Sequence, residues 1–531
     1  MKDKLRVGII LCDNFVPSWQ FHILSTLVKS DYAKISLVIK TGPAEFEIPT
    51  AKLTRLLEKA DRIIFKKEYD FNRKKDASCF TKFIPEVDLD PDVEVSISKI
   101  SYFNTDILIN LSNRSLANLW NVPKYGVWSF SINTPKAGFW EVLRKRPVTF
   151  SALEILKDNS GKKTVIFGSW ESTCNYSMHK NRNQVFWRAA LFIPRVINGL
   201  YKYGDKYLFS LKRKFESISP GDENPSGKFS ALTDVFIYGA TASRYILKKL
   251  FLTDDFNWHL LFDIRNERKL KDIRFRKFNK LIPPHDVFWA DPFVIAKGDY
   301  FVFVEEFIYK KGRAHISVLK LDQKGNMLDL RRIIEKPYHM SYPFIFIFNN
   351  TYYMIPETCK NKTIELYKCT SFPYKWEFER NIMENLYAVD STLFNYNNNW
   401  WLFTSIDQTE NISGTGTELF LFYTDDLLEG KWKSHPMNPI VSDARNARPA
   451  GKIFIQDAKI FRPAQDGSVR YGRGFNFNEI IKLSETEYEE TMISSIKPSW
   501  DKKLKGAHTY NFDHEFTIID VYSFRKRFGN R

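Results

Sequence analysis

A motif that recurs five times in the C-terminal half is the feature that most restricts the fold of this chain. Each copy has a short signature at the start of an apolar strand, then a turn and a strongly aromatic second strand. The signatures are WADPF at 289–293, SYPF at 341–344, VDSTL at 389–393, ARPA at 447–450 and GAHTY at 506–510. A single unit of a few short strands cannot bury its faces unless neighbouring units pack against it. The repeat therefore predicts an all-β, five-bladed β-propeller.

The later strands of each unit support the same interpretation. Second strands at 300–306, 352–358 and 400–405 align without gaps, and third strands follow at 316–321, 364–368 and 419–424. A β-sandwich also has alternating aromatic strands, but it does not predict this constant register between signatures. The apolar segment 256–262 precedes the first unit. It is either the strand that completes the last blade or an ordinary linker strand.

Superposing the five signatures brings one residue of each unit to an equivalent position. These residues are Asp291, Tyr342, Asp390, Arg448 and His508, and the second strands align Glu305, Glu357 and Ser405 in the same way. Inner strands start near the central funnel, so these side chains are expected around its mouth. A single surface carboxylate is most often only solvated. Recurrence across blades favours a site, and partial burial would raise the pKa of a carboxyl enough for it to act as an acid.

The N-terminal part has the pattern of an α/β domain. Apolar runs at 5–11, 35–39, 106–111 and 125–130 alternate with amphipathic stretches such as 19–28. This order predicts an open, mostly parallel sheet. We expect this domain at 1–175, a helical, basic connector with a linker at 217–230 across 176–280, the propeller at 281–524 and a basic tail at 525–531.

A net charge of +17 and a pI near 9.3 call for an anionic partner. Basic residues concentrate at 202–214, 265–280 and 525–527, among aromatic residues that include Phe275, Phe278 and Phe528. This arrangement fits a patch on anionic lipid, and the alternative is solubility alone. No nucleic-acid-binding motif accompanies the charge, so nucleic acid is not the favoured partner.

The N-terminus and the cysteines bear on the compartment. The apolar run at 7–11 is too short for a signal peptide or a membrane span, so we expect a cytoplasmic protein, in peripheral contact with the inner membrane. Five scattered cysteines without paired metal spacing agree with a reducing compartment. No metal and no cofactor is predicted.

The N-terminal domain resembles the formyltransferase fold over about residues 5–168. The resemblance rests on DILIN at 106–110, the Pro123-x-Tyr125-Gly126 turn, GFWEV at 138–142 and PVT at 147–149. In that family the strand after the turn delivers a catalytic His, where this chain reads Ser129-Phe130-Ser131. The resemblance therefore implies a degenerate domain kept for binding or docking. Asn110 matches the family Asn or is an ordinary turn former.

One further segment of this domain carries a cluster of charge. Lys180, Arg182 and Arg188 lie within 175–188. They either grip an anionic donor or acceptor, or they form a solvated helical face.

The strings WADPF, SYPF, MIPET, VDSTLF and ARPAG resemble the propeller at the N-terminus of plant glucosamine inositolphosphorylceramide transferases and of bacterial surface-polysaccharide proteins. The architecture is more distantly similar to furanosidase propellers. By position, that likeness implies Asp291 as nucleophile or base, Asp390 as the residue that fixes the sugar, and Glu357 as the acid, with Glu305 as the alternative acid. Arg448 and His508 would bind a phosphate or carboxylate, or form structural salt bridges. Tyr342 and Trp289 complete the expected substrate-binding set.

The pairing of the two domains resembles proteins of capsule and O-antigen gene clusters, some of which are thought to transfer fructofuranosyl units. It implies a glycosyltransferase that moves a furanose from an activated sugar donor to an anionic polysaccharide or a lipid-linked acceptor. A propeller glycoside hydrolase needs the same carboxylates. A non-catalytic glycan-binding scaffold is the third possibility.

Overall fold

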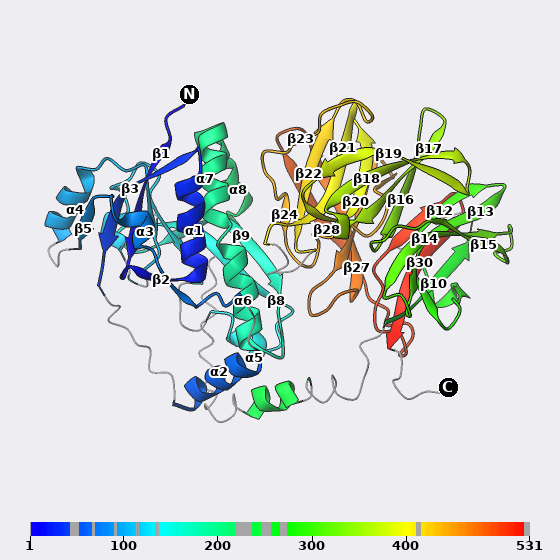
Figure 1. Ribbon diagram of the computed structural model, residues 1–531, viewed down its shortest axis with the longest axis horizontal. Coiled ribbons are helices and arrows are strands. Elements are labelled where there is room, and N and C mark those ends of the chain that lie inside the picture. Colours follow the sequence, from blue (N-terminus) through cyan, green and yellow to red (C-terminus); the bar gives the residue numbers. More distant parts are fainter. Residues whose placement is uncertain are drawn as a thin grey trace. The chain divides into compact units, whose positions relative to one another are not determined.

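The computed structural model describes residues 2–42, 52–65, 69–89, 93–112, 114, 116–132, 137–156, 158–218, 236–243, 245, 256–265, 273–409 and 416–524. The chain divides into two compact units, Met1–Tyr245 and Ile246–Arg531 (Figure 1). Among the described helices, none is long and apolar enough to cross a bilayer. The expected linker, from residue 219 on, and the expected basic tail lie outside the described residues.

The first unit is built on a seven-stranded sheet of order β5-β3-β1-β6-β7-β8-β9. Its strands are β1 (Leu5–Leu11), β3 (Ala33–Lys40), β5 (Glu86–Asp88), β6 (Ile107–Asn110), β7 (Val127–Phe130), β8 (Val148–Leu156) and β9 (Lys163–Ser172). The first five strands pair in parallel, and β8 and β9 add antiparallel pairs at one edge. The predicted mostly parallel α/β sheet is confirmed. A small antiparallel pair, β2 (Phe15–Pro17) with β4 (Lys74–Asp76), lies beside it.

Helices accompany this sheet (Figure 1), and α1, α6 and α8 pack directly on its strands. They are α1 (Ser18–Lys29), α2 (Lys52–Ile64), α3 (Ser78–Thr81), α4 (Val93–Ser101), α5 (Trp140–Leu143), α6 (Met178–Ala189), α7 (Phe192–Tyr203) and α8 (Asp205–Lys214). On α1, Trp19, Ile23 and Leu27 are buried, because a spacing of four residues puts them on one helical face. From the expected connector, α6 contacts β8 and α8 contacts β9, so both helices pack on the N-terminal sheet.

The second unit is a five-bladed β-propeller, which confirms the fold predicted from the repeat. Four blades follow one another along the chain, each an antiparallel sheet with its first strand innermost. Blade one is β12 (Val287–Lys297), β13 (Asp299–Ile308), β14 (Arg313–Leu321) and β15 (Met327–Ile334). Blade two is β16 (Ser341–Phe348), β17 (Thr351–Thr358), β18 (Thr363–Ser371) and β19 (Lys375–Glu384).

Blades three and four are less regular. Blade three is β20 (Tyr387–Tyr396), β21 (Asn399–Asp407), β22 (Glu418–Thr424) and β23 (Lys433–Ser434), with β24 (Val441–Ser442) also on β22. Blade four is β25 (Phe454–Gln456), β26 (Lys459–Asp466), β27 (Gly474–Leu483) and β28 (Tyr488–Ile496). Buried aromatic and aliphatic clusters join adjacent blades, so each blade covers a face of the next.

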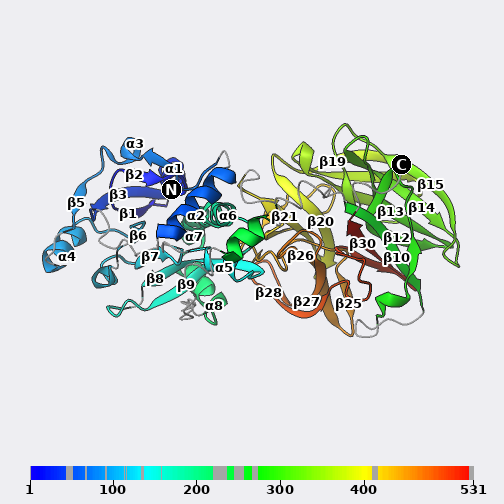
Figure 2. The same cartoon turned by 90° about the horizontal axis from the view of Figure 1, so that it is seen from below.

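The fifth blade is made from both ends of this unit. β10 (Phe256–Ile264) pairs antiparallel with β30 (Phe516–Phe524), with β29 (Tyr510–Asp513) inside and β11 (Asn279–Leu281) outside. Figure 2 shows β10 and β30 beside β12 of blade one, where the ring closes. Of the two interpretations of 256–262, the strand that completes the last blade is confirmed.

Two aromatic residues expected on a lipid-facing patch have another role. Phe275 and Phe278 are 7% and 8% exposed and pack with Leu261 and Phe475 in the propeller core. The prediction that these rings lie on a membrane surface is wrong. In the sequence they lie among basic residues, as membrane anchors do. In the structure β10 and β11 join the fifth blade, and the two rings are buried beside it.

Candidate functional site

A β-bulge at the start of three inner strands positions the residues that the signatures align. In blade one, Ala290 pairs with Glu305 and Phe293 with Phe303, so the inner strand has one extra residue between these pairs. The same offset occurs in blades two and three. Asp291, Tyr342 and Asp390 stand at the bulges with φ of 48°, 43° and 53°. A residue other than glycine costs about 1–2 kcal/mol in this left-handed range of φ. Three such residues at matching positions therefore indicate that the blades share one local backbone geometry.

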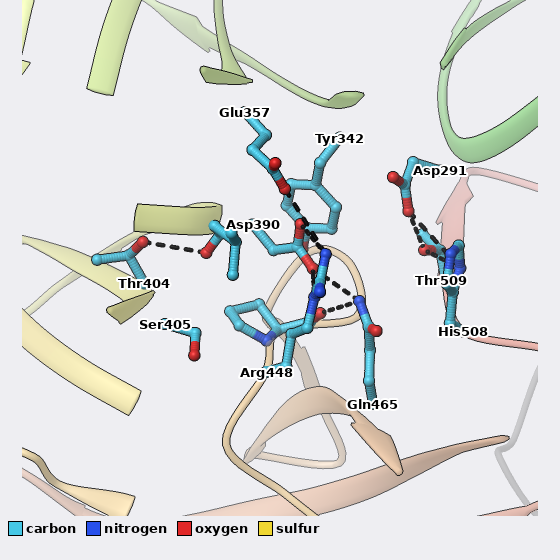
Figure 3. A network of polar contacts seen from close by, with 12 residues as sticks. Asp291, Tyr342, Glu357, Asp390, Thr404, Ser405, Arg448, Gln465, His508 and Thr509 are labelled. Carbon is cyan, nitrogen blue, oxygen red and sulfur yellow. Dashed lines mark hydrogen bonds and ion pairs between the residues drawn. The ribbon is translucent and has the colours of Figure 1, made fainter. Parts of the chain in front are cut away.

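The register also confirms the alignment of the second strands. Glu305 lies opposite Ala290, Glu357 opposite Ser341, and Ser405 opposite Val389. Blades four and five differ, because Arg448 and His508 precede their inner strands. There, isolated bridges, Pro449 with Ala464 and Gly506 with Tyr522, stand where the other blades have a continuous ladder. All five aligned positions still meet in one network of polar contacts (Figure 3).

Asp390 and Arg448 form the centre of this network. Arg448 Nε donates to Asp390 Oδ2 at 2.5 Å and Nη2 donates to Oδ1 at 3.2 Å. Gln465 Nε2 also donates to Asp390 Oδ2, at 2.7 Å. The side chain of Asp390 is fully buried, whereas that of Arg448 is 15% exposed. Asp390 is therefore a fixed anion that orients the guanidinium group of Arg448.

Glu357 borders this ion pair and reaches solvent. Its Oε2 is 3.6 Å from Arg448 Nη2, and its side chain is 11% exposed. Burial and the negative charge of Asp390 raise the pKa of Glu357 well above its ordinary value, against the opposing effect of Arg448. Burial thus favours the protonated form of Glu357, which is the state that a general acid requires.

Asp291 belongs to a second group across the network, with Thr509 and His508 (Figure 3). Asp520 completes this group through its contact with His508. Thr509 Oγ1 donates to Asp291 Oδ1 at 2.7 Å, and the Asp291 backbone N–H donates to Asp520 Oδ2 at 2.9 Å. His508 Nδ1 is 2.6 Å from Asp520 Oδ2 and 3.6 Å from Asp291 Oδ1. Its ring stacks on Trp258 of β10 with centroids 4.0 Å apart. The ring-closing strand thus supports the site.

The pKa values in this group are shifted in one direction. Burial raises the pKa of Asp291 to about 6, although the charge of His508 opposes the shift. The pKa of His508 is raised because the attraction of Asp520 and Asp291 outweighs the effect of its burial. A pKa of about 6 leaves Asp291 mostly ionised at pH 7, whereas burial favours the protonated form of Glu357.

This shift predicts how stability depends on pH. Between pH 4 and 6 the folded protein binds more protons at Asp291 than the unfolded chain does, so this carboxyl makes unfolding easier as pH rises. Raising an Asp pKa from 3.8 to about 6 corresponds to a loss on the order of 3 kcal/mol. We expect Asp291→Asn to gain stability relative to wild type between pH 4.5 and 7.5, measured by urea unfolding. A constant difference between the two proteins would contradict the shifted pKa.

The remaining predicted residues differ in accessibility. Glu305 Oε1 is 3.4 Å from His339 Nε2 with 9% of its side chain exposed, and burial raises its pKa well above its ordinary value. Trp289 is 1% exposed and donates from Nε1 to Glu306. Tyr342 is fully buried, with its hydroxyl between Thr392 and the backbone N–H of Gly451. Trp289 and Tyr342 therefore stabilise the blades from within.

The structure adds residues that the sequence reasoning missed: Gln465, Thr509, Asp520, Tyr471 and His339. Tyr471 is 40% exposed, lies 5.1 Å from the Arg448 guanidinium and contacts the His508 ring edge-on. An exposed ring beside buried carboxylates is a surface on which a sugar can stack. Of these residues, Asp520 could have been recognised from the sequence, because it is an acidic residue inside the apolar run 516–524.

One group of described residues could hold a cation. Asp291, His508 and Asp520 each bring one ligand atom within 4.8 Å of the others. The hydrogen bonds that Asp520 accepts from the backbone N–H groups of His508 and Thr509 already orient this group.

Comparison with known proteins gives a partial match. Residues 282–525 match the family described as glucosamine inositolphosphorylceramide transferase 1, N-terminal. A protein of that name from Oryza sativa subsp. japonica is 36% identical over 228 residues, which are 42% of this chain and 30% of that protein. Its namesake from Arabidopsis thaliana is 31% identical over 242 residues, 44% of this chain and 31% of that protein. This chain thus spans under a third of the length of these curated relatives.

Solved structures are much less similar. The native arabinanase of Bacillus subtilis is 13% identical, with a TM-score of 0.32, over 44% of this chain and 93% of that one. The family match and the curated relatives, unlike the solved structures, agree on one likeness. The propeller of this chain is similar in sequence to the N-terminal region of plant proteins named glucosamine inositolphosphorylceramide transferase 1.

Proposed function

We propose that this protein is a glycosyltransferase whose propeller carries out the chemistry. The observation that carries the proposal is a pair of carboxyls with different partners in one site. Glu357 lies 3.6 Å from Arg448 and has a pKa raised well above its ordinary value, while Asp291 accepts a hydrogen bond from Thr509 and has a pKa raised to about 6. The sequence match to proteins named as transferases supports the same class. Because those proteins are more than three times as long as the matched segment, their activity comes to this chain only as part of this proposal.

The chemistry follows from the state of each carboxyl. Glu357 donates its proton to the glycosidic or leaving-group oxygen as the bond to the anomeric carbon breaks. Asp291 acts on the opposite side, as base toward the acceptor hydroxyl or as nucleophile toward the anomeric carbon. Asp390 keeps Arg448 in place, and Arg448 in turn faces the negative charge that develops on a phosphate-bearing leaving group.

The substrates form the finer part of the proposal. We infer a furanose donor such as an activated fructofuranose, and a capsular or O-antigen polysaccharide or lipid-linked acceptor. The likeness of the blade signatures to bacterial surface-polysaccharide proteins supports this choice, as do the distant likeness of the architecture to furanosidase propellers and the aromatic surface of Tyr471. The cation of Arg448 beside Glu357 favours an anionic donor. A cytoplasmic location at the inner membrane belongs to the same proposal.

For the first unit, we infer a formyltransferase-like domain that binds or docks without transferring formyl groups. Ser129 stands on β7 beside Asn110 of β6, where the family would have its His. Asn110 itself accepts from Ser112 and donates to the Arg114 carbonyl, as a turn-forming residue does. Two adjoining cavities, of about 190 and 250 Å³, share Phe71, Asn72 and Arg182 as walls and offer room for a small ligand.

A transfer assay with the full chain tests the proposal. Activated sugars, furanoses included, are incubated with acidic polysaccharide or lipid-linked acceptors, and labelled sugar is followed in the acceptor and in free form. We expect label to enter the acceptor. Release of free sugar without transfer would assign the propeller to the glycoside hydrolases. Glycan binding without any turnover would make it a scaffold. Either result contradicts the proposal.

A further inference from the structure

We infer that one face of the first unit, on the hairpin of α7 and α8, docks on an anionic lipid surface. This basic hairpin face consists of Lys2, Lys124, Lys202, Tyr203, Lys206, Phe209 and Arg213, all of which are exposed. The inference does not depend on the chemistry of the propeller.

The spacing of α8 separates an inner from an outer side. Tyr207, Leu208 and Leu211 are buried against the first unit. Lys206, Phe209 and Arg213 lie at i, i+3 and i+7, so they form a stripe on the opposite side. Phe209 stands between the two cations with 68% of its surface exposed, and Tyr203 on the preceding turn is 49% exposed. Exposed aromatic residues among cations are the pattern of a helix that lies in the interface of a membrane.

Two distant segments add charge at the turn of this hairpin, between the end of α7 and the start of α8. Lys2 Nζ donates to the Tyr201 carbonyl at 2.6 Å, and the Tyr201 hydroxyl donates to the Lys2 carbonyl at 3.0 Å, which fixes the N-terminus beside α7 (Figure 1). Lys124 lies over the ring of Tyr125, whose hydroxyl donates to Asp205 in the first turn of α8. Asp205 is the one acidic residue of α8, against Lys206, Lys212, Arg213 and Lys214, so cations dominate the face.

The chemistry of the face selects lipid over a soluble polyanion. Cations alone would serve either partner, whereas an exposed Phe209 gains free energy only where it can leave water. Lys and Arg residues near an anionic leaflet attract it by about 1 kcal/mol each, or about fivefold in binding. Phosphatidylglycerol in a phosphatidylcholine bilayer supplies both the charge and the apolar layer.

Flotation of the full chain with vesicles tests this inference. We expect binding to phosphatidylcholine vesicles that contain phosphatidylglycerol, and weak binding to phosphatidylcholine alone. The double variant Lys206→Glu/Arg213→Glu should reduce binding about 30-fold or more, from about fivefold for each cation. Lys34→Glu/Lys82→Glu makes the same charge change at exposed lysines elsewhere in the first unit and should retain binding.

A second pair of variants separates lipid from other anions. Phe209→Ser should weaken vesicle binding several-fold, while Phe83→Ser, which removes a ring that is 92% exposed, should not. The face would be assigned to a soluble polyanion, and the inference overturned, by two results together. Heparin binding would fall in the double variant but not in Phe209→Ser, and vesicle binding by Phe209→Ser would equal that of the wild type. Equal binding to neutral and anionic vesicles, or equal losses in both double variants, would overturn it as well.

Discussion

Replacing Glu357 with Gln is expected to reduce glycosyl transfer by about 10²- to 10⁴-fold, the range that a general acid contributes. The amide has nearly the shape of the carboxyl but no acidic proton to donate. Burial raises the pKa of Glu357 well above its ordinary value, so the folded protein favours the neutral side chain, whereas the unfolded chain ionises it at pH 7. By the same linkage as at Asp291, the substitution should therefore raise the free energy of unfolding at neutral pH. Initial transfer rates and urea unfolding of the same preparation measure the two effects.

Glu365 on β18 provides a matched control in the same blade. This carboxylate is 3% exposed and accepts hydrogen bonds from Tyr338, Tyr367 and Asn361. These bonds outweigh its burial and lower the pKa of Glu365, so it is held ionised. Glu365→Gln should lower stability, since hydrogen bonds to a charged group contribute about 1.5–3 kcal/mol, and should retain transfer. The two glutamates thus predict opposite patterns of activity and stability.

The variant Glu305→Gln decides whether Glu357 or Glu305 is the general acid, a choice that the sequence left open. The pKa of Glu305 is also raised by burial, and its carboxyl lies beside His339 instead of Arg448. If Glu305→Gln abolishes transfer while Glu357→Gln does not, the acid is Glu305 and our assignment is wrong. If both variants transfer at the wild-type rate, neither carboxyl is the acid.

The repeat allowed the fold to be predicted because it encodes position as well as composition. The superposition of WADPF on SYPF and VDSTL anticipated the pairing of Glu305, Glu357 and Ser405 with the inner strands. It did so because all three copies keep the same bulge. The closing role of 256–262 stayed undecided, since no local pattern distinguishes a strand that pairs with β30 from a linker strand.

Burial within the site could not be predicted in the same way. Trp289 and Tyr342 alternate with apolar residues as funnel-facing side chains would, but adjacent blades enclose them. The partners of Asp390 and Asp291 were also hidden, because Gln465 and Asp520 lie 75 and 229 residues away along the chain. Only the closed ring brings such residues together, so the aligned positions were predictable and their hydrogen-bond partners were not.

Removal of the Arg448 charge is expected to have the largest effect on stability. In Arg448→Met, Asp390 would keep Gln465 as a hydrogen-bond partner but lose its counter-ion in a fully buried position. Breaking a buried ion pair on one side costs about 3–5 kcal/mol. Asp390→Asn in the same chain should recover much of this loss, because it removes the unpaired charge. Urea unfolding of the two single variants and the double variant measures the coupling.

Arg445→Met is the matched control for this cycle, three residues earlier in the same loop. Arg445 pairs with Asp443 through Nε and Nη2, but its side chain is 41% exposed. Solvent screens this pair, so its loss should cost about 1 kcal/mol or less. If Arg448→Met is no more destabilising than Arg445→Met, or if Asp390→Asn adds to the loss, then Asp390 is not held as an anion by Arg448. The site would then lack the fixed charge that keeps Glu357 protonated, and its role as the acid would lose its physical basis.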